Sequence, residues 1–169
     1  MIRKIFIALL AILVIIQFFR PKRNDSGIHD HAITDKYPMP AEVSTLFKNA
    51  CYNCHSNTTA YPWYANVQPV AWWLADHIRE AKQHLNFDDF TGRRIAFQNH
   101  KLEEIAENIE EKEMPLPSYT WLGLHPEAHL TQDQRQLMID WAKAMMDTLK
   151  NQYPVDSLKM PKRPERKSD

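Results

Sequence analysis

The residues Cys51-Tyr52-Asn53-Cys54-His55 decide the fold of this chain. The two thiols stand three residues apart, so each can add across one vinyl group on the same edge of a porphyrin. The imidazole that follows them can then reach the central iron. The motif therefore predicts one covalently attached haem c, with Cys51 and Cys54 as the attachment points and His55 as a ligand of the iron.

Three other interpretations of the two cysteines remain open. A thioredoxin-like redox pair needs a βαβ context and a thiolate at a helix N-terminus, whereas the flanking sequence here is helical and stiffened by prolines. A disulfide between Cys51 and Cys54 leaves His55 without a role. A zinc site could join the two cysteines to His125 and His129, although about seventy residues separate the two halves, far more than in a compact zinc finger.

The composition favours helices joined by stiff turns. The 169 residues include 3 glycines and 11 prolines, a balance unlike that of a hairpin-rich sheet protein. The formal net charge is zero, which gives no reason to expect nucleic acid as a partner.

The N-terminus resembles an export or anchoring segment. An Arg-Lys pair at residues 3–4 precedes a continuous apolar run at residues 5–16. Residues 17–23 offer no small-residue cleavage site, so the run predicts an uncleaved signal-anchor. We therefore expect residues 1–20 to form a single-pass transmembrane helix in a bacterial inner membrane, with the haem domain in the periplasm. A buried core helix is the alternative interpretation.

Charged residues and prolines indicate three further segments in the rest of the chain. We expect a polar tether at residues 21–40, a cytochrome c-like haem-binding domain at residues 41–150 and a basic, disordered tail at residues 151–169. Together with the N-terminal segment, this organisation predicts an all-α protein built around one haem.

Helical periodicity locates the elements of that domain. Apolar residues recur at helical spacing over about residues 41–50, 70–85 and 101–112. Thr131 is expected to cap a last helix that ends near residue 150. Phe47 and Trp141 are expected to pack where the first and last of these helices cross.

A second iron ligand is expected downstream of the motif. Met114 lies after a predicted helix, in the proline-bordered run Met114-Pro115-Leu116-Pro117, which would hold a thioether still. Met/His ligation raises the reduction potential relative to bis-histidine ligation. Met114 as a filler of core space is the alternative, and four histidines compete with it as ligands: His77, His84, His100 and His125.

Aromatic side chains near the motif are expected to cover the porphyrin. Trp63, Trp72 and Trp73 are rigid and apolar, and a haem presents a large flat apolar surface. We therefore assign these three residues to cofactor binding, together with the motif and Met114.

Several separated motifs agree in order with one family. Residues 51–59 (Cys-Tyr-Asn-Cys-His-Ser-Asn-Thr-Thr) are followed by Tyr-Pro-Trp-Tyr at 61–64 and Pro-Val-Ala-Trp-Trp at 69–73. Further motifs lie at residues 101–105, 113–119 and 125–128. Over about residues 37–150 the chain resembles the bacterial haem-binding domain proteins, which look like small membrane-anchored relatives of monohaem cytochromes c. The resemblance implies a single c-type haem on Cys51, Cys54 and His55.

The expected function is one-electron transfer at the periplasmic face of the membrane. The protein would ligate, bury and tune the haem as an electron carrier rather than act as an enzyme, and it would meet a redox partner protein. A haem-based sensor or peroxidase-like enzyme is the first alternative, and a zinc-stapled interaction module is the second.

Overall fold

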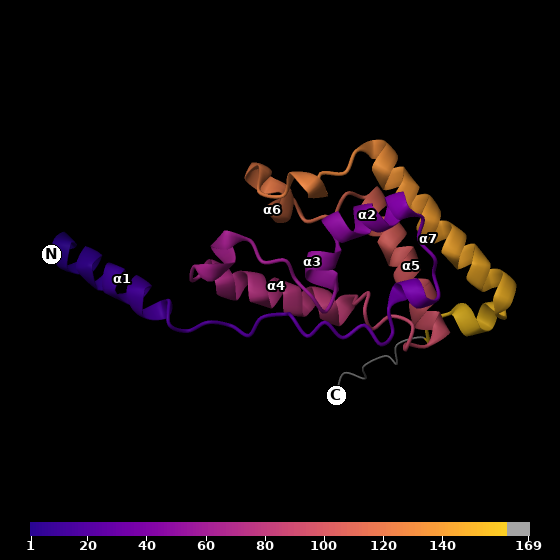
Figure 1. The fold of residues 1–169 in the computed structure, drawn as a ribbon, viewed down its shortest axis with the longest axis horizontal. Coiled ribbons are helices and arrows are strands. Elements are labelled where there is room, and N and C mark those ends of the chain that lie inside the picture. Colours follow the sequence, from indigo (N-terminus) through magenta and orange to yellow (C-terminus); the bar gives the residue numbers. More distant parts are fainter. Residues whose placement is uncertain (162–169) are drawn as a thin grey trace, which may run out of the picture. The chain divides into compact units, whose positions relative to one another are not determined.

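The computed structural model describes residues 1–161 of the chain and divides it into two compact units. Unit 1 comprises Met1–His29 and Tyr52–Asp88, and unit 2 comprises Asp30–Cys51 and the described residues from Asp89 onward. Helices dominate both units, and residues 1–161 contain two isolated β-bridges but no strand. The predicted all-α class is confirmed (Figure 1).

Unit 1 is built around one amphipathic helix. Helix α4 (Val70–His84) buries Leu74 and Ile78 on one face. The short helix α3 (Tyr52–His55) and the 3-10 turn η2 (Trp63–Asn66) pack against α4. Helix α1 (Ile2–Ile16) also belongs to this unit.

The chain leaving α1 is tied to the loop that precedes α4. The amide of Gln68 donates to Gln17 Oε1 at 2.9 Å, and Gln17 Nε2 donates back to the Gln68 carbonyl at 3.2 Å. The carbonyl of Phe19 accepts from Gln68 Nε2 at 2.9 Å and from the Trp72 indole at 2.8 Å. Gln68 is buried, with 1% of its surface exposed. Its Oε1 accepts from the Trp72 amide at 3.2 Å, so all of its polar groups have partners.

Unit 2 contains the larger apolar core. Helices α5 (Ile95–Glu110) and α7 (Gln132–Gln152) pack along one another (Figure 1), and α2 (Ala41–Ala50) also packs on α7. Phe47 and Trp141 meet edge to face with ring centroids 5.1 Å apart, which confirms the predicted contact. Shorter elements complete the unit: η1 (Ile33–Asp35), α6 (Pro117–Thr120), η3 (Trp121–Gly123), η4 (Pro126–Ala128) and η5 (Val155–Leu158).

The predicted cap of the last helix is confirmed. Thr131 accepts from the Gln134 amide at 3.2 Å, and the Gln134 side chain accepts from the Thr131 amide at 2.9 Å. This reciprocal pair is a capping box, which satisfies two donors that the first turn of a helix leaves without intrahelical partners.

Helix α5 begins earlier than predicted. Leu102, Ile105 and Ile109 are buried in it, but the helix starts at Ile95 rather than near residue 101. Gln98 occupies the buried face of the added turns, and a polar residue there interrupts the apolar periodicity on which the prediction depended.

The predicted N-terminal membrane anchor is wrong. Among residues 1–161, no helix is long and apolar enough to cross a membrane. Helix α1 has 15 residues, which at about 1.5 Å per residue span about 22 Å, whereas a bilayer core is about 30 Å thick. The inner-membrane, single-pass location that depended on this anchor is therefore contradicted.

Two segments expected to be loose are ordered where the structure describes them. In the segment predicted as a tether, Ile33 and Tyr37 are buried, and Tyr37 donates to Gln98 at 2.6 Å. In the predicted tail, α7 runs to Gln152 and η5 buries Leu158. The remainder of that tail, residues 162–169, lies outside the described residues.

Candidate functional site

The Cys-x-x-Cys-His motif follows directly from helix α2. Cys51 closes α2, where its amide donates to the Phe47 carbonyl at 2.9 Å. The single turn of α3 then carries Cys54 and His55. Both cysteines are half-buried thiols and are not joined by a disulfide.

His55 is oriented by a backbone carbonyl. Its Nδ1 lies 3.0 Å from the Leu85 carbonyl oxygen. Because a carbonyl oxygen only accepts hydrogen bonds, this contact assigns the proton to Nδ1 and the lone pair to Nε2. Metal-ligating histidines have this arrangement, in which an outer partner fixes the tautomer and ring orientation. His55 therefore fits the role of an iron ligand through Nε2.

The surroundings of His55 are aromatic. The Phe87 ring lies 6.0 Å from the His55 ring at an interplanar angle of 62°, and Tyr52 stacks on Phe87 at 4.9 Å. The Phe87 amide also donates to the His55 carbonyl at 2.8 Å. The segment after α4 thus contacts both the backbone and the ring of His55.

The Cys54 thiol lies in a helical context unlike that of a thioredoxin-type redox pair. Burial raises its pKa to about 11, so the group is a neutral thiol near pH 7. The helical context of Cys54 in α3 also lacks the βαβ unit of that interpretation.

The histidines of the zinc alternative have other partners. His125 is buried, its Nδ1 lies 3.1 Å from Glu127 Oε1, and its ring stacks on Tyr119 at 3.9 Å. His129 Nε2 lies 2.9 Å from the Thr120 carbonyl. Within the part of the chain that the structure describes, no group of three or more His, Cys, Asp or Glu residues could hold a metal ion.

Met114 lies in a loop that α7 holds in place. The Met114 amide donates to the Asn108 carbonyl at 3.1 Å. Arg135 Nη1 donates to the Met114 carbonyl at 2.8 Å and to the Ile109 carbonyl at 3.2 Å. The Met114 side chain is half-buried and belongs to unit 2, whereas His55 belongs to unit 1.

The three tryptophans assigned to cofactor binding all lie in unit 1 and are exposed. Trp63 in η2 has 76% of its surface exposed, and Trp72 and Trp73 in α4 have 39% and 47%. Trp73 also packs against His77, with ring centroids 4.2 Å apart. Tryptophan is highly buried on average, and exposed apolar surface of this kind often marks a binding site. The three exposed rings are therefore available to a flat apolar group.

The remaining candidate histidines lie on helices. His84 is the last residue of α4, and His100 in α5 forms ion pairs with Glu103 and Glu104 at 3.6 and 3.0 Å. His77 Nδ1 lies 2.9 Å from the Trp73 carbonyl. Each of these contacts is local to one helix.

Sequence reasoning missed two contributors to the His55 environment. Leu85 acts through its backbone carbonyl, which carries no side-chain signal. Asp88 is buried, with 4% of its side chain exposed, and pairs with His29 at 2.8 Å. No motif in the sequence marks Asp88.

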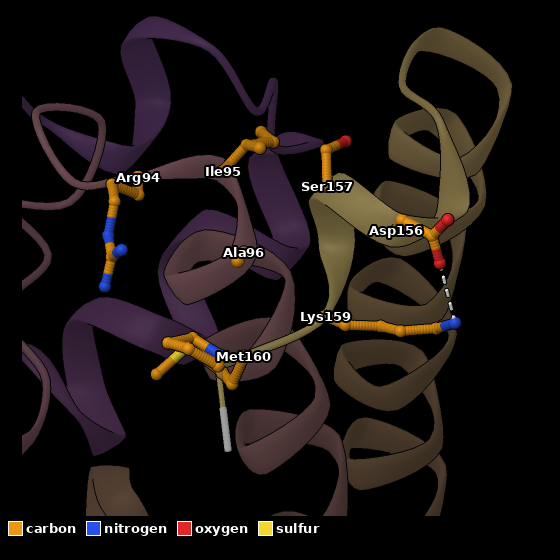
Figure 2. A pocket seen from close by; sticks show the side chains of 8 residues that line it. Arg94, Ile95, Ala96, Asp156, Ser157, Lys159 and Met160 are labelled. Carbon is orange, nitrogen blue, oxygen red and sulfur yellow. Dashed lines mark hydrogen bonds and ion pairs between the residues drawn. The ribbon is translucent and has the colours of Figure 1, made fainter. Parts of the chain in front are cut away.

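An open cavity of about 660 Å³ lies elsewhere, in unit 2. It is lined by residues from the start of α5 and from η5, and Figure 2 shows the Asp156–Lys159 ion pair (2.9 Å) at one side of it. None of the predicted haem residues lines this cavity.

A helical protein with a carbonyl-oriented histidine directly after two thiols has the features of a cofactor-binding protein. The sequence model of the haem-binding domain family matches residues 11–144, so the chain belongs to this haem-binding domain family. The protein is therefore a haem-binding protein, and the family resemblance inferred from the motifs is confirmed. No curated protein and no solved structure matches the chain.

Proposed function

We propose that the chain carries one c-type haem, held by thioether bonds to Cys51 and Cys54, and that it transfers single electrons. When bound, the haem iron supplies a one-electron couple between Fe(III) and Fe(II). The observation that carries the proposal is the Leu85 carbonyl 3.0 Å from His55 Nδ1, because it leaves Nε2 as the ring nitrogen of His55 that would bind the iron.

The roles of the other residues follow from their chemistry. Thioether formation consumes thiols, and both cysteines are thiols rather than a disulfide. Met114 is the proposed distal ligand, since its loop is fixed by Arg135. Trp63, Trp72 and Trp73 provide apolar cover for the porphyrin, and a redox partner protein supplies or removes the electron.

The test of covalent attachment uses the full chain made in a host that matures c-type cytochromes. Haem should remain on the chain after denaturing electrophoresis and after acid-acetone extraction. The Cys51→Ala/Cys54→Ala variant should lose this covalent haem. Extractable haem in the unaltered protein would refute thioether attachment.

The role of His55 is tested separately. His55→Ala should alter the visible spectrum of the ferrous protein, because the iron loses an imidazole ligand. His129→Ala is the matched control and should leave both the haem content and the spectrum unchanged. If the zinc alternative were correct, His129→Ala would instead release zinc from a chain without haem.

A further inference from the structure

The segment at residues 85–88 contacts the backbone and the ring of His55. The Leu85 carbonyl lies 3.0 Å from His55 Nδ1, and the Phe87 amide donates to the His55 carbonyl at 2.8 Å. The first contact orients the His55 ring and the second holds the His55 backbone, so both depend on the position of residues 85–88. The segment follows the end of α4 at His84, so it needs an anchor of its own.

Asp88 supplies that anchor. Its Oδ2 accepts from the Asn57 amide at 2.6 Å, and its Oδ1 pairs with His29 Nδ1 at 2.8 Å. The carboxylate thus joins three separate stretches of unit 1, around residues 29, 57 and 88. Hydrogen bonds to a charged, buried acceptor are among the stronger ones in proteins.

A neighbouring amide pair reinforces this connection. Asn86 Nδ2 donates to Asn57 Oδ1 at 2.9 Å, and Asn86 Oδ1 accepts from the Asp88 amide at 3.0 Å. Lys82 also lies near Asp88. Burial lowers the pKa of Lys82, and the charge of Asp88 opposes that shift. The carboxylate is thus a buried negative charge close to the segment that orients His55.

We propose that Asp88 is a positioning residue that sets the reduction potential of the haem through His55, an inference that rests on the proposed function. Asp88 keeps the Leu85 carbonyl in line with His55 Nδ1, which makes the imidazole a stronger donor to the iron. Its negative charge also favours Fe(III) over Fe(II). Both effects lower the potential, so the loss of Asp88 should raise it.

Two substitutions separate the two effects. Asp88→Asn keeps an oxygen acceptor for the Asn57 amide and removes the charge, whereas Asp88→Ala removes both. The matched control is Asp89→Asn, which makes the same chemical change at the next residue, where the carboxylate is exposed and paired with Arg93. The full haem-loaded chain is used throughout, and thermal unfolding checks that each variant is folded.

The measurement is a redox titration followed by visible absorption. The potential should rise in Asp88→Asn and rise further in Asp88→Ala. At a fixed ambient potential, the ratio of oxidised to reduced protein should fall on the order of tenfold in Asp88→Ala. For a one-electron couple, a tenfold change in this ratio corresponds to a rise of about 59 mV in the reduction potential. Asp89→Asn should match the unaltered protein.

The outcomes distinguish the two levels of the proposal. If the unaltered chain holds no covalent haem, the proposed function fails and this inference fails with it. If the haem is present but the potential of Asp88→Asn equals that of Asp89→Asn, or falls below it, only the role of Asp88 is overturned. If Asp88→Ala does not fold, Asp88→Asn decides the question alone.

Discussion

Met114 is the residue on which the distal side of the proposed haem site depends. Its carbonyl is held by Arg135 and its amide by Asn108, so the backbone is fixed on both sides of the side chain. A pure core filler is expected to be fully buried, as Met138 is in α7, whereas Met114 is half-buried. These features favour a ligand over a filler.

Substitution of this methionine should change the iron spectrum. Met114→Ala should remove the weak near-infrared absorption that a thioether–ferric bond produces, while the haem stays covalently bound. The potential should fall, because a methionine ligand favours Fe(II), and the ferrous protein should gain carbon monoxide binding.

The matched control for this test is Met146→Ala, which truncates another half-buried methionine. If Met114 only filled core space, its loss would cost about 2–5 kcal/mol of stability and leave the spectrum unchanged. Carbon monoxide binding by the unaltered protein would favour a sensor or peroxidase-like function over electron transfer.

The site residues differ in how far the sequence revealed them. Cys51, Cys54 and His55 are adjacent in the chain, so their grouping could be predicted from spacing alone. The partner of His55 is a backbone carbonyl thirty residues away, and any residue type can supply one. Asp88 was equally hidden, because its partners Asn57 and His29 come together only through folding.

At the scale of single helices, capping accounts for the best sequence predictions. The start of α7 was predicted because Thr131 is a residue type that favours the N-cap. The structure adds Gln134, three residues further on, as the second half of a capping box. The start of α5 was missed because its first turns bury the polar residue Gln98, whose Oε1 accepts a hydrogen bond from Tyr37. The burial of Gln98 thus depends on a partner distant in sequence, which local periodicity does not reveal.

Removal of the α7 cap should destabilise unit 2. Thr131→Ala loses the hydrogen bond from the Gln134 amide and should lower the free energy of unfolding by about 1 kcal/mol. Urea denaturation measures this loss, and Thr131→Ser should restore most of it. Thr148→Ala, within the same helix, is the control and should be neutral or slightly stabilising, because alanine has the higher helix propensity.

At the scale of the whole chain, the two units differ in how much apolar surface they bury. Among the described residues of unit 1, the buried apolar side chains are Ala71, Leu74, Ile78 and Phe87. The rest of the buried apolar core, including Phe47, Leu102, Met138 and Leu149, belongs to unit 2. Unit 1 therefore has the smaller core to stabilise it.

This difference predicts a graded response to loss of the haem. In the Cys51→Ala/Cys54→Ala variant, hydrogen exchange followed by mass spectrometry should show α5 and α7 still protected. Amides of α3 and α4 should exchange faster than in the haem-loaded protein, because a bound group stabilises the state that binds it. Equal protection of α3 and α4 in both forms would show that unit 1 does not depend on the haem.

The bonds between Gln17, Phe19, Gln68 and Trp72 have a practical consequence for shortening the chain. A chain that begins after Phe19 lacks the partners of three polar groups of Gln68: its amide, its carbonyl and its Nε2. The Gln68 Oε1 keeps its bond from the Trp72 amide. Each buried polar group left without a hydrogen-bond partner lowers the free energy of unfolding by about 1–3 kcal/mol. A shortened chain for crystallisation should therefore start no later than Gln17, because the apolar helix can be cut away but the two residues beyond Gln17 are part of the folded unit.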